Sequence, residues 1–248
     1  MSYSSASPRR YQIDVVDQVG RAYQTVFDRL QLLAEIALLP YLIVLAIALV
    51  ALLMPLGIFG AVLAALVHAL GFLLFGAVFL VRWHRFILLG ENVGAGFIPP
   101  GWGEFVIVGV KLGGLVFLGW LVLALVAVLP PYFLTIPLSG IGGVALTLGA
   151  LRASLVFPAA AIRHPVALRT AWDWVAGNFW RLFACTFAAY FPFLVVQMVI
   201  GGVSHLFPAL FGIVFEALRL AVAFGGAAVV AALLSHLYQD VGANSTGR

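Results

Sequence analysis

The chain has 248 residues, of which 64% are hydrophobic and 9% are charged, and its formal net charge is +4. So few polar residues cannot cover a soluble globule, which excludes that class and indicates a polytopic membrane protein. The basic residues stand at the ends of apolar stretches, where membrane topology explains them better than nucleic-acid binding does.

The chain begins with a polar stretch and continues with an amphipathic one. Residues 1–12 show no apolar periodicity, and we expect them to form a disordered cytoplasmic tail. From Ile13 to Leu30, apolar residues recur three and four positions apart, with charged and polar residues between them. This pattern predicts an amphipathic helix over about 13–31 that lies in the membrane interface.

Six apolar stretches follow, and each is long enough, at about 1.5 Å per residue, to cross a hydrocarbon core of about 30 Å. Their approximate limits are 32–54, 57–81, 106–129, 132–152, 182–201 and 216–238. The turns 54–56 and 130–131 are so short that they predict tight antiparallel hairpins. The predicted fold class is therefore all-α: a polytopic membrane helical bundle with six transmembrane helices in a single domain, 13–240.

A second interfacial amphipathic helix is predicted in the long connection before the fifth span. Pro165 suits a first helical turn, and Leu168, Trp172 and Val175 begin one apolar stripe, so the helix should cover about 165–181. Residues 241–248 are expected to form a flexible cytoplasmic tail.

The basic residues are distributed unevenly between the two ends of these spans. Twelve of the thirteen fall on one side, and only Arg219 falls on the other. Because basic residues concentrate on the cytoplasmic side of a membrane, both termini are predicted to be cytoplasmic.

An internal repeat is visible at a fixed offset. Arg82 precedes Lys111 by 29 residues, Arg152 precedes Arg181 by 29 residues, and the two pairs are offset by 70. A third copy begins at Arg29. The chain thus predicts three two-helix hairpin repeats, related by rotation about an axis near the membrane normal.

Catalytic signatures are missing from the sequence: it has no HExxH, no Walker A loop and no G-x-S-x-G elbow. We therefore expect no catalytic residues, no cofactor and no metal, and an embedded enzyme is not expected. Cys185, the single cysteine, excludes an intramolecular disulfide and a cysteine-based metal cluster.

Two polar residues inside the spans are candidates for an intramembrane polar site. His68 stands near the middle of the second span, and Gln197 lies in the fifth. A polar group at that depth must face another helix or a wet cavity. Both interpretations stay open: an interhelical hydrogen bond, or a ligand or proton site.

A layer of charged residues is predicted at the cytoplasmic ends of the spans. Either these residues anchor the helix ends by snorkelling, or they form a basic pocket for anionic lipid headgroups. Glu35 is expected to form an ion pair with Arg82, and otherwise with Arg152, because an unpaired carboxylate at that depth is costly. The members of this layer are Arg29, Glu35, Arg82, Arg85, Lys111, Arg152 and Arg181.

Glycines and alanines are plentiful in the spans, with Gly142 and Gly143 adjacent in the fourth and Gly225 and Ala228 in a small-residue stripe of the sixth. Small residues permit close helix contact, within one chain or between chains.

Two segments, 82–91 (RWHRFILLGE) and 152–161 (RASLVFPAAA), together with Ala171-Trp172 and 177–182 (GNFWRL), carry a resemblance to a bacterial group. The chain resembles six-span inner-membrane proteins of the YciC-like type and the membrane domain attached to some glycerophosphodiester phosphodiesterases. The resemblance implies a multi-pass protein of the bacterial inner membrane. It implies no catalytic site, since the metal-binding carboxylates of the phosphodiesterase domain have no counterpart here.

Two functions from different classes remain open. The first is a non-catalytic integral membrane protein that organises lipids, anionic ones among them, or a partner: another membrane protein or a second copy of the chain. The second is a small permease-like carrier of a lipid or another amphiphile, with His68 and Gln197 facing a cavity. Neither function involves nucleic acid as a partner. A polar cavity at bilayer depth would favour the carrier, and a dry, glycine-packed bundle would favour the organiser.

Overall fold

The computed structural model describes residues 12–52, 57–91, 96–129, 131–207 and 211–246. All regular secondary structure in these residues is helical, as predicted. The elements in chain order are α1 (Val15–Phe27), α2 (Leu30–Leu52), α3 (Ile58–Gly71), the π-helical turn η1 (Phe72–Gly76), α4 (Ala77–Leu89), α5 (Trp102–Ala127), α6 (Tyr132–Ala153), α7 (Val156–Ala161), α8 (Leu168–Trp174), α9 (Phe179–Leu206) and α10 (Gly212–Thr246).

Among the described residues, six helical segments are long and apolar enough to cross a membrane, which agrees with the predicted number of spans and indicates a multi-pass membrane protein. They comprise α2, the continuous run of α3, η1 and α4, then α5, α6, α9 and α10. Several are longer than a bilayer requires. The 35 residues of α10 extend for about 50 Å, against a hydrocarbon core of about 30 Å, so part of α10 must lie outside that core.

The structure corrects several predicted boundaries. The second span was expected to end at residue 81, but the helix continues through α4 to Leu89 and ends at Gly90, whose φ of +66° suits a left-handed helix cap. The interfacial helix expected over 165–181 is limited to the seven residues of α8, followed by a turn with a positive φ at Gly177. The tail expected from residue 241 is helical to Thr246.

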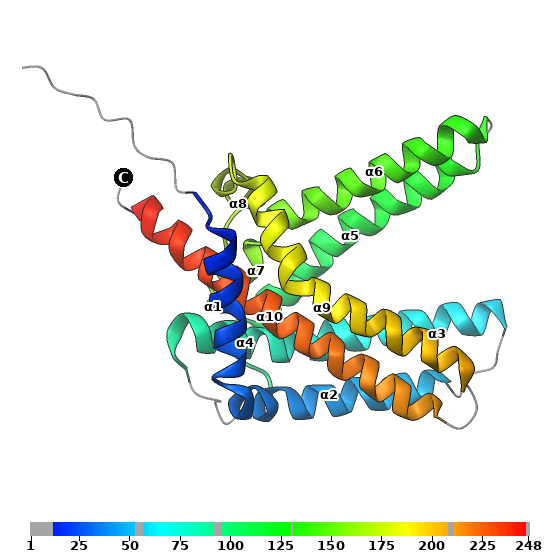
Figure 1. Ribbon diagram of the computed structural model, residues 1–248, viewed down its shortest axis with the longest axis horizontal. Coiled ribbons are helices and arrows are strands. Elements are labelled where there is room, and N and C mark those ends of the chain that lie inside the picture. Colours follow the sequence, from blue (N-terminus) through cyan, green and yellow to red (C-terminus); the bar gives the residue numbers. More distant parts are fainter. Residues whose placement is uncertain (1–11, 53–56, 92–95, 130, 208–210, 247–248) are drawn as a thin grey trace, which may run out of the picture.

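Consecutive spans pack as antiparallel neighbours: α2 with α3, α5 with α6, and α9 with α10. The hairpins do not share one direction. Figure 1 shows α2, α3, α9 and α10 extending together to one side, whereas α5 and α6 diverge from them. We call the α5–α6 hairpin the arm. None of the residues in the most apolar stretch of α5 is buried, while half of those in the corresponding stretch of α10 are.

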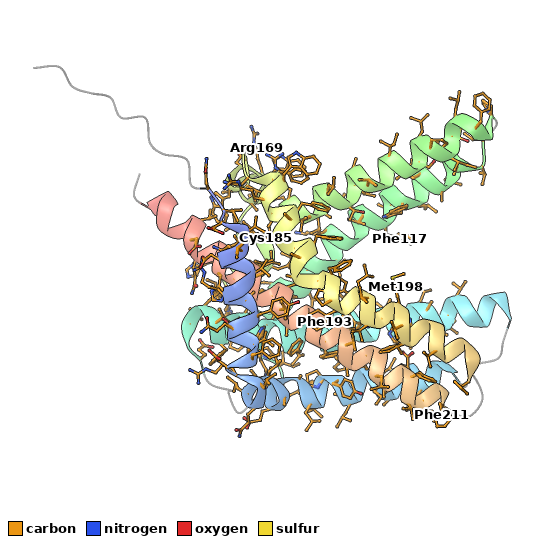
Figure 2. The ribbon with its side chains drawn as sticks, viewed as in Figure 1. Phe117, Arg169, Cys185, Phe193, Met198 and Phe211 are labelled. Atoms are coloured by element: carbon orange, nitrogen blue, oxygen red, sulfur yellow. The ribbon has the colours of Figure 1, made fainter. Side chains whose placement is uncertain are left out.

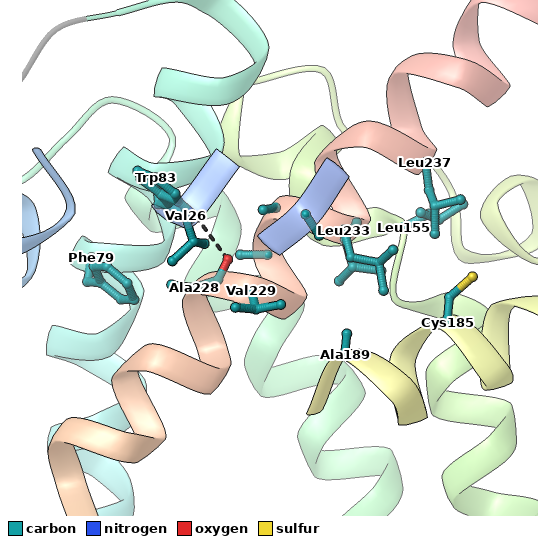
Figure 3. Packing of buried hydrophobic residues seen from close by; sticks show 14 of the residues in the cluster. Val26, Phe79, Trp83, Leu155, Cys185, Ala189, Ala228, Val229, Leu233 and Leu237 are labelled. Carbon is teal, nitrogen blue, oxygen red and sulfur yellow. Dashed lines mark hydrogen bonds between the residues drawn. The ribbon is translucent and has the colours of Figure 1, made fainter. Parts of the chain in front are cut away.

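The buried core lies at the end of the molecule where these two directions meet. We call it the base cluster, and it unites α1, α4, the start of α9 and the second half of α10 (Figure 3). Trp83, Leu182 and Leu233 are among its completely buried side chains. α1 is an amphipathic helix, as predicted, and it inserts Ala22 and Val26 between α9 and α10. Most of the side chains exposed on the arm and on the outer surface of α9, such as Phe117 and Met198, are apolar (Figure 2).

Glycines bring the two helices of the arm into close contact. An added Cβ at Gly142 would lie 2.6 Å from a methyl of Leu123, and one at Gly143 would overlap the ring of Trp120. On the other side of the pair, Gly119 faces Leu146 in the same way. The small residues of α6 are thus used for packing within the chain.

The basic residues of the predicted repeat stand at different distances from the helix starts. Arg181 is two residues after the first residue of α9, and Arg29 is one residue before α2. Lys111, in contrast, is nine residues inside α5. The threefold rotational relation of the hairpins stays a prediction.

Candidate functional site

The most deeply buried polar contact joins α4 to α10. His84 Nδ1 lies 2.7 Å from the Ser235 hydroxyl, which donates to the carbonyl of Ala231 at 2.8 Å. Because the single hydroxyl proton is used in that second bond, Nδ1 of His84 carries the proton and donates to Ser235. Next to it, the indole N–H of Trp83 donates to the Ala228 carbonyl at 3.0 Å. These bonds fix the register of α4 on α10.

A second polar group attaches α1 to the end of α10. Asp240 accepts hydrogen bonds from Gln18 at 2.6 Å and from Arg21 at 2.8 Å. One helical turn away, Nε2 of His236 lies 2.9 Å from the hydroxyl of Thr25. The bonds to the Asp240 carboxylate are charge-assisted. All three contacts join residues more than 200 positions apart, so they hold α1 against α10 in the tertiary structure.

The same helix is attached to α9 by its other side. The hydroxyl of Tyr23 donates to the Ala189 carbonyl at 2.9 Å, and burial raises the pKa of Tyr23, so the hydroxyl stays protonated. Just before α1, the backbone of Ile13 donates to Asn178 at 3.1 Å and accepts from Arg181 at 2.9 Å. Arg181, predicted as a headgroup or ion-pair residue, therefore has a structural partner in the backbone.

The expected ion pair between Glu35 and Arg82 is not formed. Arg82 donates to the carbonyls of Gly96 and Phe97, which ties the end of the second span to the loop that follows it. Glu35 instead accepts from the amide of Gln31, one turn away, at 3.2 Å. The prediction of this pair was wrong because Arg82 lies on a continuing helix whose side chain reaches its own connecting loop. The alternative partner, Arg152, is also used elsewhere.

Arg85 forms the best-defined ion pair of the predicted layer. Its guanidinium makes two bonds to Glu91, at 2.5 and 2.7 Å, and a third to the Ala161 carbonyl at 3.0 Å. Glu91 thus neutralises it, and the third bond holds α7 against α4. Such a planar, two-pronged contact is a structural use of arginine.

Three basic residues of the predicted layer form no ion pair with a carboxylate of the described residues. Arg29 and Lys111 are exposed, and neither side chain forms a hydrogen bond or ion pair with any residue that the structure describes. Arg152 donates from Nε to the Trp172 carbonyl at 3.1 Å, and its guanidinium lies 4.4 Å from the centre of the Trp172 ring. Arg152 therefore orients Trp172, and no carboxylate in the described part of the chain forms an ion pair with it.

The two intramembrane candidates are not brought together. Gln197, on α9, donates to the Arg219 carbonyl of α10 at 2.6 Å, so it is an interhelical clamp. His68, on α3, is half-buried and has no hydrogen-bond partner within the described part of the chain. Neither residue lines any of the three pockets described below.

Three pockets formed by described residues open on the outside of the helices, and their walls are mainly apolar. One of about 380 Å³ lies between α5, α6 and α8, a second of about 350 Å³ between α2, α4 and α10, and a third of about 230 Å³ between α6 and α9. Only the first includes a cationic side chain, that of Arg169, which is exposed. Within the described ranges, no group of three or more His, Cys, Asp or Glu side chains could hold a metal ion.

Sequence reasoning missed His84 and Arg169 as site residues. His84 stands between Trp83 and Arg85 in a segment expected to leave the membrane, so nothing in the local pattern indicates burial. Arg169 was counted for topology, and only the fold places it beside α5 and α6.

No protein-family model, curated protein or solved structure matches the chain.

Proposed function

We propose that the protein is a non-catalytic integral membrane protein that organises lipids around its arm. The observation that carries the proposal is the divergence of the arm: α5 and α6 pack closely on each other, and their apolar side chains remain exposed along most of their length. A surface of this kind contacts acyl chains directly. We propose, on the resemblance described above, that the membrane is the bacterial inner membrane.

The charges support an arrangement with the base cluster at the cytoplasmic face. α1, α8 and the ends of α4 and α10 carry polar contacts, and the long helices extend from them. With both termini on that side, Arg29, Lys111 and Arg152 would face the anionic headgroups of the cytoplasmic leaflet. A second copy or another membrane protein would compete with lipid for the arm.

The carrier function has less support. A carrier needs a polar path at bilayer depth, whereas the three pockets are mainly apolar and open outward, and Gln197 is used as a helix clamp. His68, which has no hydrogen-bond partner among the described residues, is the residue whose substitution tests the carrier function.

The experiment compares two properties of the full chain in vesicles of phosphatidylethanolamine and phosphatidylglycerol. Electron paramagnetic resonance of lipids spin-labelled on the acyl chain measures the fraction held at the protein, and a fluorescent-lipid quenching assay measures transbilayer movement. A restricted fraction without faster transbilayer movement supports the organiser. Transbilayer movement that is accelerated by the protein and lost in His68→Ala would overturn it in favour of the carrier.

A further inference from the structure

We infer that the pocket between α5, α6 and α8 is a binding site for one anionic phospholipid, with the phosphate at Arg169 and an acyl chain along the arm. We call this pocket the arm groove; its lining includes Leu112, Val116, Leu146, Gly149, Arg169 and Trp172. The inference rests on the proposed function and names the lipid class and the residues that would select it.

The dimensions of the arm groove fit an acyl chain in one leaflet. Its lining on α6 extends from Ala145 to Ala153, a rise of about 12 Å, compared with about 15 Å for half of a hydrocarbon core. Its volume of about 380 Å³ lies in the range of small-molecule sites, about 300–1,000 Å³. A Cβ added at Gly149 would stand in ordinary van der Waals contact with the Trp172 ring, at 3.7 Å, so the two residues lie side by side in the groove wall.

The charge at one end of the arm groove is not neutralised by the protein. Arg169 is exposed and has no ion pair within the described ranges, although Asp173 is one turn further along α8. Arg152, stacked on the lining residue Trp172, adds a second positive charge close by. An anionic headgroup would complement both charges.

The shape of the arm groove and its charge have different roles, because the groove is surrounded by lipid and not by water. Acyl chains are as apolar as the groove walls, so an apolar groove alone gives no preference for one lipid over bulk lipid. Selectivity must come from the headgroup end, where one basic residue near the membrane surface changes affinity for an anionic lipid by about fivefold. Shape decides whether a chain fits, and Arg169 decides which headgroup is retained.

The test uses native mass spectrometry of the purified full chain in detergent, titrated separately with phosphatidylglycerol and with phosphatidylcholine of identical acyl chains. Phosphatidylcholine carries the same phosphate beneath a cation, so the comparison isolates net headgroup charge. The wild type should retain one phosphatidylglycerol in preference to phosphatidylcholine, and Arg169→Ala should reduce that preference by about fivefold. Ala145→Phe, which fills the groove, should reduce retention of both lipids.

Arg219→Ala is the matched control. It removes one exposed cation from α10, and Arg219 neither lines the arm groove nor shares the predicted membrane side of Arg169. The control should keep the wild-type preference. An equal loss in Arg219→Ala and Arg169→Ala, or no loss in Arg169→Ala, would overturn the site, as would protein dimers that persist and exclude lipid.

The spin-label measurement described above separates this inference from the proposed function. If the wild type holds a restricted lipid fraction but shows no preference for phosphatidylglycerol, the arm groove site is wrong and the organising function stands. If the wild type holds no restricted fraction, the organising function itself is wrong. Thermal unfolding of each variant checks that it folds; Arg169 has no hydrogen bond to lose within the described residues, so its variant should match the wild type.

Discussion

Nδ1 of His84 on α4 lies 2.7 Å from the hydroxyl of Ser235 on α10, and both side chains are buried. The two residues are 151 positions apart. Their contact joins the second span to the sixth, the helix that packs against more of the molecule than any other in the described ranges.

Ser235→Ala should therefore destabilise the fold, because it leaves the imidazole N–H of His84 buried without an acceptor. The expected loss is about 1–3 kcal/mol in free energy of unfolding. Thermal unfolding in detergent measures it. Thr147→Ala is the control, since among the described residues that hydroxyl bonds within its own helix, to Gly143 at 2.9 Å. An unchanged midpoint in Ser235→Ala would contradict the geometry.

Gly101→Ala should destabilise the junction between the loop and α5. Gly101 has φ of +87°, and an added Cβ would lie 2.5 Å from the Ala161 carbonyl oxygen at the end of α7. The backbone strain alone costs about 1–3 kcal/mol. Gly103→Ala, two residues later in α5, meets nothing within 4 Å and should be neutral or stabilising. The thermal midpoint should fall in Gly101→Ala and should not fall in Gly103→Ala; a fall in both variants would count against this interpretation.

Asp240→Asn should loosen α1 from the base cluster. The change removes the charge that holds Gln18 and Arg21, and hydrogen bonds to charged groups contribute about 1.5–3 kcal/mol each. Amide hydrogen exchange should accelerate across 15–27, while α5 keeps its protection. Asp28→Asn, at an exposed position at the end of the same helix, is the control. Equal exchange in both variants would show that Asp240 does not hold α1.

Glu35→Gln and Arg82→Gln should have additive effects on stability. The two side chains have different partners, Gln31 for Glu35 and the carbonyls of Gly96 and Phe97 for Arg82. A double-mutant cycle should therefore give a coupling energy no larger than about 0.5 kcal/mol. A larger favourable coupling would restore the ion pair that the charge pattern suggested.

Both termini should lie in the cytoplasm, because twelve of the thirteen basic residues fall on one side of the six spans. Reporter fusions at Ser2 and Gly247, with enzymes active only on one side of the membrane, check this. A periplasmic signal at either end would reverse or break the proposed topology. A reporter inserted between the third and fourth spans, at 130–131, should give the opposite signal to that at the termini.

The sequence by itself determined the class of the molecule and its spans. Hydrophobic length is a local property, so 132–152 predicted α6 (Tyr132–Ala153) almost to the residue. Helix ends were less predictable where basic residues follow an apolar run: Arg82 and Arg85 suggested an exit from the membrane, yet α4 continues because its own loop and Glu91 satisfy them.

Only the tertiary structure decided which polar residues work together. Composition cannot show that His84 meets Ser235, that Asp240 holds α1, or that Arg169 lies at a groove between α8, α5 and α6, since each relation depends on helices distant in sequence. The divergence of the arm from the other helices is likewise decided by the tertiary structure. Close packing of α5 on α6 through Gly142 and Gly143 satisfies both helices without the rest of the bundle, and their remaining apolar surface is left to lipid.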